Sequence, residues 1–322
     1  MEKKVNDLID KALSRRNFLA GAGTAAASVL AGCGGSSTPT PTSTPTPTPT
    51  PTPAITDADI LTFALNLEYL EAEYYLYAAT GSGLSATDAG TGAGTTIVPS
   101  TTKVPFATSY IQQYANEIAQ DELNHVRFLR SALSAAGATV QPRPAIDLTF
   151  FAGLATAAGI SGTFNPFADE NSFLVGAFVF EDVGVTAYSG AAPLITNKAS
   201  YLSPAAGIQA VEAYHAAEIR TIIAANAASS TATTAQTAAL ANANLVSTLR
   251  GKISAASGNM LAAETPLSTS SIVAADSTNA IAFARTTDQV LHIVYGGTAG
   301  VGVAKGGFFP AGLNGTIKST TT

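Results

Sequence analysis

The stretches "IAQDELNHVRFLR" (residues 118–130) and "IQAVEAYHAAEIR" (residues 208–220) have the same local pattern. Each reads Ile, three residues, Glu, two residues, His, three residues, an aliphatic residue and Arg. The chain has three histidines, and two of them, His125 and His215, stand in this pattern. Positions i and i+3 of an α-helix lie on one face about 5 Å apart. Each Glu–His pair can therefore reach a single point beside its helix.

Two further segments are predicted to be helices that each contribute a single Glu. Their apolar residues recur at spacings of three and four, which is typical of helices. Glu68 and Glu181 each lie within an otherwise apolar face, and each is followed seven residues later by a tyrosine, Tyr75 or Tyr188. The order Glu, Glu-x-x-His, long connection, Glu, Glu-x-x-His indicates a duplicated helix pair. We therefore predict an all-α four-helix bundle with helices near residues 56–80, 106–136, 171–195 and 204–227.

Six side chains are predicted to meet inside this bundle as metal ligands: Glu68, Glu122, His125, Glu181, Glu212 and His215. Four carboxylates and two imidazoles are the ligand set of di-iron and di-manganese bundles. Oxygen and imidazole ligands suit iron or manganese. Four buried carboxylates without counter-charge are costly, and two divalent cations balance them. The predicted cofactor is two iron ions, with manganese as the alternative.

The segment from about Ile55 to Ala225 resembles a ferritin-like domain. The stretches "ALNLEYLEAEYYLYA" (residues 64–78) and "GGFFPAGLNG" (residues 306–315) resemble exported ferritin-like proteins grouped with plant desiccation-related proteins. The resemblance covers most of residues 55–315. It implies a ferritin-like four-helix bundle with a long crossover and additional C-terminal helices. It also implies that Glu68 and Glu181 are terminal ligands and that Glu122 and Glu212 bridge the two metals.

The resemblance further implies a supporting role for Asp121, which precedes Glu122 in an Asp-Glu-x-x-His motif. In ferritin-like oxidases such an Asp orients a ligand His. Val211 stands at the equivalent place in the second half, so the support is asymmetric. For Tyr75 and Tyr188 two interpretations stand. Each hydrogen-bonds a ligand or donates an electron, or each packs in the core with a satisfied hydroxyl.

Glu71 lies one turn beyond Glu68 and is the alternative ligand from the first helix, but the shared tyrosine offset favours Glu68. The other candidates are expected to lie outside the site. We expect solvated or surface positions for Glu73, Glu117 and Glu218, helix-end or surface positions for Arg130 and Arg220, an orientation away from the ligands for Asp182, and packing for His292.

The N-terminus carries two export signals in the expected order. "SRRNFLA" (residues 14–20), with Arg15 and Arg16, resembles a twin-arginine signal. An apolar run of about 15 residues follows, too short to span a bilayer. It ends in "LAGC" (residues 30–33), which resembles a lipobox at Cys33, the chain's one cysteine. We predict removal of residues 1–32, lipidation of Cys33, and export to the periplasm or cell surface with the export machinery and the membrane as partners.

Three further segments follow this signal. Residues 33–53 hold the lipobox Cys and a Thr/Pro-rich linker, in which the alternating Thr and Pro of residues 38–53 predict an extended spacer of roughly 50 Å. Residues 54–227 are the predicted bundle, and residues 228–322 a helical and loop extension packed on it. A composition of 46% hydrophobic and 12% charged residues argues against disorder. The net charge of −6 gives no basis for nucleic-acid binding.

Two classes of function fit this pattern. The first is an oxidoreductase acting on oxygen, peroxide or ferrous iron through two metals. The second is a non-enzymatic metal-binding stress or desiccation protein, or a metal-free scaffold.

Overall fold

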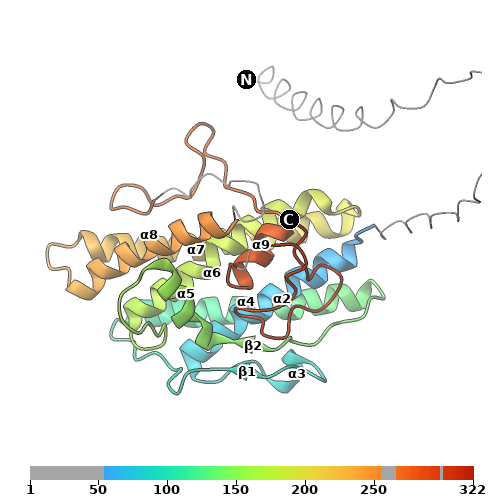
Figure 1. Ribbon diagram of the computed structural model, residues 1–322, viewed down its shortest axis with the longest axis horizontal. Helices are drawn as coiled ribbons and strands as arrows, with labels where there is room; N and C mark the ends of the chain where they lie inside the picture. Colours follow the sequence, from blue (N-terminus) through green and yellow to red (C-terminus); the bar gives the residue numbers. More distant parts are fainter. Residues whose placement is uncertain (1–53, 255–265, 298–299) are drawn as a thin grey trace, which may run out of the picture. The chain divides into compact units, whose positions relative to one another are not determined.

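The computed structural model describes residues 54–254, 266–297 and 300–322, and four long helices form its centre (Figure 1). They are α2 (Asp57–Thr80), α4 (Ser109–Ala135), α6 (Glu170–Ala191) and α7 (Lys198–Ala228). Helix α2 packs along α4, and α6 packs along α7. The predicted all-α bundle is confirmed. Helix α7 begins before Pro204, where the sequence suggested its start because proline favours the first turn of a helix.

Carboxylates and hydroxyls fix the starts of these helices. Thr56 and Asp59 form a reciprocal capping box at the start of α2. Asp169 accepts the first free N–H groups of α6. The Glu170 carboxylate accepts hydrogen bonds from the N–H groups of Ala107 and Thr108, at 2.9 and 2.8 Å, just before α4 begins. The two helix pairs are thus tied together at this end of the bundle.

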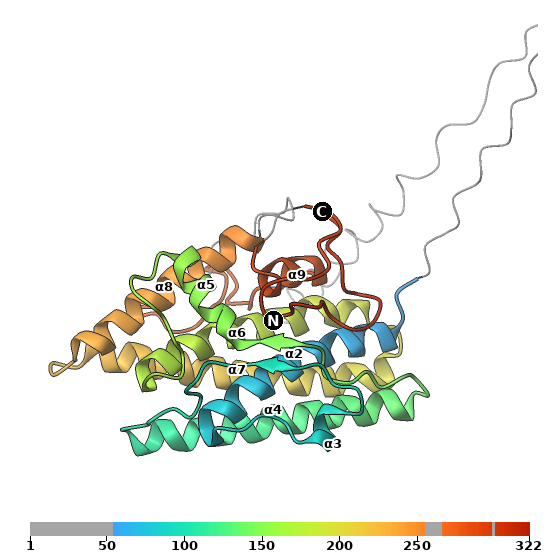
Figure 2. The ribbon, with the colours of Figure 1, turned by 60° about the horizontal axis from the view of Figure 1, so that its bottom comes forward.

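A long crossover joins α4 to α6 and runs beside α2. It carries β2 (Ile146–Asp147), η1 (Leu148–Phe150) and α5 (Phe151–Ala158). The loop between α2 and α4 carries α3 (Ala86–Ala89) and β1 (Thr96–Ile97). The strands β1 and β2 pair in parallel, with Thr96 opposite Ile146, and lie near each other in Figure 2. This pairing anchors the crossover to the α2–α4 loop.

Aromatic rings join the crossover, the bundle and the C-terminal segment. The Tyr74 ring stacks on Phe173 with centroids 5.8 Å apart, and its hydroxyl donates to the Phe173 carbonyl at 2.8 Å. Phe151 of α5 meets Tyr74 at 5.3 Å and Phe308 at 5.0 Å. Phe308 also packs edge-on against Phe180 of α6. Segments far apart in the sequence therefore share one apolar core.

The C-terminal extension packs on α6 and α7 and reaches α2. Helix α8 (Thr234–Ser254) contacts α6 and α7, and α9 (Thr287–Val294) contacts α8 and α6. The tail after α9 is held on α2 by a reciprocal pair of hydrogen bonds between Asn66 and the Asn314 backbone, both at 3.0 Å. Gly307 allows this path because its φ is +53° and a Cβ there would lie 2.4 Å from the Val294 carbonyl.

Two expectations about charged residues were wrong. Arg220 is buried, not at the surface, and donates to Asp182 at 2.9 Å. Arg250 of α8 donates to the same carboxylate at 2.8 Å. Glu73 is also buried, and pairs with Arg143 of the crossover. Both errors arise because α8 and the crossover cover helix faces that local spacing alone marks as exposed. Asp182 lies outside the ligand cluster, as expected.

One described segment, Glu170–Leu194, is long and apolar enough to cross a membrane. However, 83% of its most apolar window is buried within the bundle, as in the core helix of a folded domain. The twin arginines, Cys33 and the Thr-Pro spacer lie outside the described residues.

Replacing Asp182 with alanine leaves two buried guanidinium groups without this carboxylate. We expect Asp182→Ala to lower the free energy of unfolding by about 3–5 kcal/mol. Arg127→Ala is the control, because the Arg127 side chain is 52% exposed in its pair with Asp88, and a pair screened by solvent is worth about 0–1 kcal/mol. Urea unfolding measures both, and equal small losses would contradict a structural role for the buried network.

Candidate metal centre

The six predicted ligands come together in the middle of the bundle, and all are buried. One group, whose potential ligand atoms all lie within 4.8 Å of one another, contains Glu68, Glu122, His125 and Glu212. A second group contains Glu122, Glu181 and His215. Glu122 belongs to both groups, which is the position that a bridging carboxylate requires. Each group has one imidazole, so the arrangement has two halves, as the duplicated pattern indicates.

Both imidazoles turn Nδ1 toward the carboxylates. His125 Nδ1 lies 3.2 Å from Glu68 Oε2, 3.3 Å from Glu122 Oε2 and 3.5 Å from Glu212 Oε1. His215 Nδ1 lies 3.0 Å from Glu122 Oε1 and 3.6 Å from Glu181 Oε2. The two rings face each other with centroids 6.3 Å apart. Donor atoms from four helices therefore converge on one small volume.

Several of these buried atoms have no hydrogen-bond partner, although they lie close together. They are Glu122 Oε1, Glu181 Oε2, both carboxylate oxygens of Glu212, and His215 Nδ1. Buried polar atoms are almost always hydrogen-bonded, so a cluster without partners needs another explanation. Cations between the lone pairs would satisfy all of them. Oxygen-rich donors with one imidazole per half fit iron or manganese, and no sulfur ligand is among them.

The two tyrosines support the cluster crosswise. Tyr75 of α2 donates its hydroxyl hydrogen to Glu181 of α6, and Tyr188 of α6 donates to Glu68 of α2. Of the two interpretations of these tyrosines, the structure favours a hydrogen bond to a predicted ligand. Each hydroxyl occupies one carboxylate oxygen and leaves the other directed toward the imidazoles.

Asp121 supports only one half of the cluster. Its carboxylate lies 3.3 Å from His215 Nε2, the ring nitrogen that points away from the other ligands. A carboxylate at this nitrogen favours the tautomer whose Nδ1 lone pair is free for a metal. Val211 stands at the equivalent position of the second half and has no carboxylate to offer. The asymmetry expected from the sequence is therefore present in the side-chain contacts.

Burial and mutual repulsion determine the protonation of this cluster without metal. Burial raises the pKa of Glu68 to about 7, against the opposing effect of His125. Burial and the Glu122 charge raise the pKa of Glu212 well above its ordinary value. Burial disfavours charge on His215, but Glu181 and Glu122 outweigh it and raise its pKa to about 12. Protons therefore take the place of cations, and a metal must displace them to bind.

Glu71 also lies in this buried region, although the sequence pattern indicated it only as an alternative ligand to Glu68. Both residues are buried: Glu68 contacts His125, and Glu71 lies behind the ligands, outside both groups. Burial, followed by the charges of Glu212 and Glu122, raises the pKa of Glu71 well above its ordinary value. The i,i+3 spacing of Glu68 and Glu71 is the signal that could have identified both.

The remaining candidates lie around the cluster rather than in it. Glu117 is exposed and Glu218 is half-buried on the outer faces of α4 and α7. Arg130 donates to the Tyr69 hydroxyl at 2.5 Å. His292 is fully buried in α9, as expected of a packing residue.

Gly184 gives Glu212 the space that its carboxylate occupies. A Cβ at this position would lie 2.1 Å from Glu212 Oε2. We expect Gly184→Ala to displace this oxygen and weaken metal binding at least tenfold, about the effect of disturbing a ligand's support. Chelator competition measures the affinity. Gly207→Ala, at an open position in α7, is the control and should bind metal like the wild type. Equal affinities in both variants would contradict a ligand role for Glu212.

Comparisons with known proteins identify the family of the fold. The model of the ferritin-like domain family matches residues 56–225. The desiccation-related protein PCC13-62 of Craterostigma plantagineum is 33% identical over 176 residues, which cover 52% of this chain and 53% of that protein. The chain thus spans about half the length of this relative. The ferritin-like catalase Nec2 of Nesocodon mauritianus is 28% identical over 274 residues, 81% of this chain and 84% of that protein.

No solved structure matches the chain significantly. The family match covers more than half of the chain and includes all four bundle helices with their buried Glu and His residues. This protein belongs to the ferritin-like domain family.

Proposed function

We propose that this protein is a catalase-type enzyme in which two iron or manganese ions are held by the six buried ligands. The reaction converts two molecules of hydrogen peroxide into two of water and one of dioxygen. One peroxide is oxidised and the other is reduced, so no separate electron donor is needed. The observation that supports a metal-dependent function is the convergence of buried carboxylate and imidazole atoms that lack hydrogen-bond partners.

The metals would supply the redox chemistry, by taking two electrons from one peroxide and returning them to the next. The chain supplies geometry and a dry environment. Glu122 belongs to both groups of potential ligands, and Glu212 belongs to the group with His125. Tyr75 and Tyr188 orient the outer carboxylates. Asp121 holds the His215 ring with Nδ1 inward. All six ligands are buried, which keeps bulk water away from the centre.

The similarity to a ferritin-like catalase supports this choice over other oxidase chemistry. The matched region covers 84% of that protein, and so extends well beyond the bundle into the C-terminal half of this chain. The alternative is a non-enzymatic metal-binding protein, which the higher identity to a desiccation-related protein favours. In that case the same ligands would bind metal without turning over peroxide.

Metal analysis and oxygen evolution test the proposal together. We expect about two iron or manganese ions per chain and release of one dioxygen for every two peroxides consumed. Glu122→Ala should lower both metal content and activity, the latter at least about hundredfold, because one carboxylate serves both halves. Glu117→Ala, an exposed glutamate of the same helix, is the matched control and should behave like the wild type.

Two outcomes would contradict the proposed catalase activity. If the wild-type protein binds two metals but evolves no dioxygen, the result supports the alternative, a non-enzymatic metal-binding protein. A wild-type protein that takes up neither metal would reject both functions.

We also propose that the protein is exported and attached to a membrane by lipid on Cys33. The twin arginines, the apolar run and the lipobox support this in their order and spacing. Cys33→Ala should release the protein from the membrane fraction of the source cell type, while Ser37→Ala should not. Unchanged membrane retention of Cys33→Ala would contradict the anchor.

A further inference from the structure

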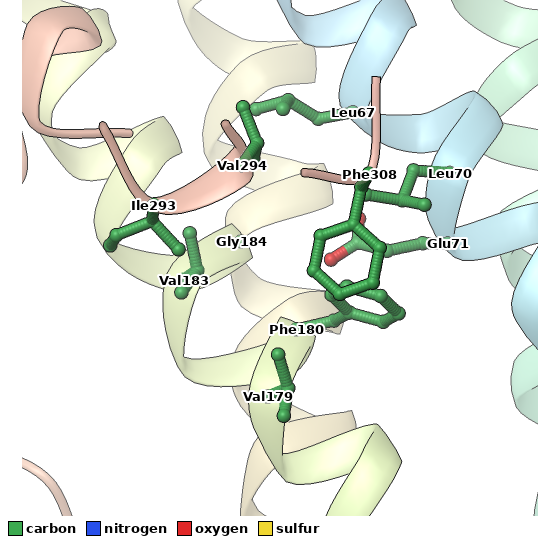
Figure 3. A pocket seen from close by; sticks show the side chains of 10 residues that line it. All are labelled: Leu67, Leu70, Glu71, Val179, Phe180, Val183, Gly184, Ile293, Val294 and Phe308. Atoms are coloured by element: carbon green, nitrogen blue, oxygen red, sulfur yellow. The ribbon is translucent and has the colours of Figure 1, made fainter. Parts of the chain in front are cut away.

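A small pocket lies on the side of the centre formed by α2, α6 and α9. Its volume is about 20 Å³, close to that of one water-sized sphere. Figure 3 shows the Glu71 carboxylate directed into this space beside Phe308 and Phe180. Apart from Glu71 and Gly184 the lining is hydrophobic: Leu67, Leu70, Val179, Phe180, Val183, Ile293, Val294 and Phe308.

The pocket exists where the two halves of the duplicated sequence differ. Glu71 follows Glu68 by three residues, and Gly184 follows Glu181 by three, so the two are equivalent positions. A Cβ at Gly184 would lie 2.1 Å from Glu212 Oε2 and 3.4 Å from Glu71 Oε1. Gly184 thus makes room for the Glu212 carboxylate of its own half, and it lies beside the Glu71 carboxylate of the other half. Glu71 and Gly184 both line the pocket, and Glu212 lies directly behind Gly184.

The opposite side of the centre is polar. There Asp121, whose side chain is 38% exposed, contacts His215. On the same outer face, partial burial and the nearby charges of Glu117 and Asp121 raise the pKa of Glu218, against the opposing effect of His215. This side suits hydrated cations. An ion would lose its hydration in the hydrophobic pocket, which therefore suits a small molecule without charge.

We propose that the pocket between α2, α6 and α9 is the route by which hydrogen peroxide reaches the metal centre, with Glu71 as its polar contact at the inner end. This inference rests on the proposed function for the identity of the substrate. Peroxide is uncharged and of the size that the pocket admits. The Glu71 carboxylate accepts a hydrogen bond from a peroxide O–H, a contact that no donor among the described residues makes. Val294 and Phe308 of the C-terminal extension form one wall of this route.

Filling the pocket by one methylene group tests the route. Val183→Leu on α6 and Val294→Leu on α9 each add a group comparable in size to a water molecule. The full chain is loaded with ferrous iron, and the association rate of nitric oxide, a small uncharged probe, is followed by absorption after rapid mixing. We expect both variants to slow association at least about tenfold, while the iron content stays at the wild-type level.

The control is Val175→Leu, a buried valine of the same helix that does not line the pocket. It should bind nitric oxide at the wild-type rate. Unchanged rates in both pocket variants would overturn the route and would point to the polar side. Because this measurement needs bound iron but no turnover, it can fail while catalase activity stands, and it can succeed if catalase activity is absent.

A metal-free readout keeps the route testable if iron does not bind. Crystals of the metal-free protein under krypton pressure should show a krypton atom between Val183 and Phe308. The atom should be lost in Val183→Leu and retained in Val175→Leu. Its absence from the wild type would overturn the route.

Glu71→Leu tests the polar contact, since it keeps a similar side-chain volume and removes both oxygens that can accept a hydrogen bond. We expect wild-type metal content and nitric oxide association, with a fall of about tenfold or more in kcat/KM for peroxide. Loss of a metal from this variant would show that Glu71 is itself a ligand, and wild-type kinetics would show that it does not contact peroxide. Either result overturns the proposed role of Glu71.

Discussion

The bundle must accommodate several glutamates whose carboxylates lie within a few ångströms of one another in a buried space. Two carboxylates 4 Å apart repel each other by about 4 kcal/mol at the effective dielectric of a protein. Glu122, Glu212 and Glu71 each repel others of the set. A few such pairs together match the entire stability of a typical domain, about 5–15 kcal/mol. Positive charge at the centre is therefore the condition on which the structure depends, whether it comes from protons or from cations.

The fold brings these charged side chains together by placing them on rigid helices. Each ligand lies on one of four long helices, and hydrogen bonds at the helix ends and between the helix pairs fix their positions. The crosswise bonds from Tyr75 to Glu181 and from Tyr188 to Glu68 link the two halves of the duplication directly at the site. The halves differ at Asp121 and Val211, and again at Glu71 and Gly184. These differences give the centre one polar side and one hydrophobic side.

Spacing alone was enough to predict that these buried glutamates and histidines converge, because i,i+3 pairs and seven-residue offsets are set by helix geometry. The same rule placed Tyr75 and Tyr188 on the ligand faces but could not choose between packing and hydrogen bonding, which depends on the helix opposite. Glu73 was assigned to the surface because its partner, Arg143, comes from the crossover. Arg220 was assigned there because α8, whose Arg250 shares the Asp182 carboxylate with it, covers that face of the bundle. The local pattern does not reveal the position of either segment. The hydrophobic pocket was not predictable, because it needs Phe308 from the C-terminal tail beside α2.

The most direct measurement is a crystal structure of the iron-loaded protein with an anomalous difference map recorded at the iron edge. Two peaks within about 4 Å of each other are predicted, one beside His125 and one beside His215, with Glu122 in contact with both. A single peak, or peaks outside the cluster of buried glutamates, would contradict the dinuclear centre.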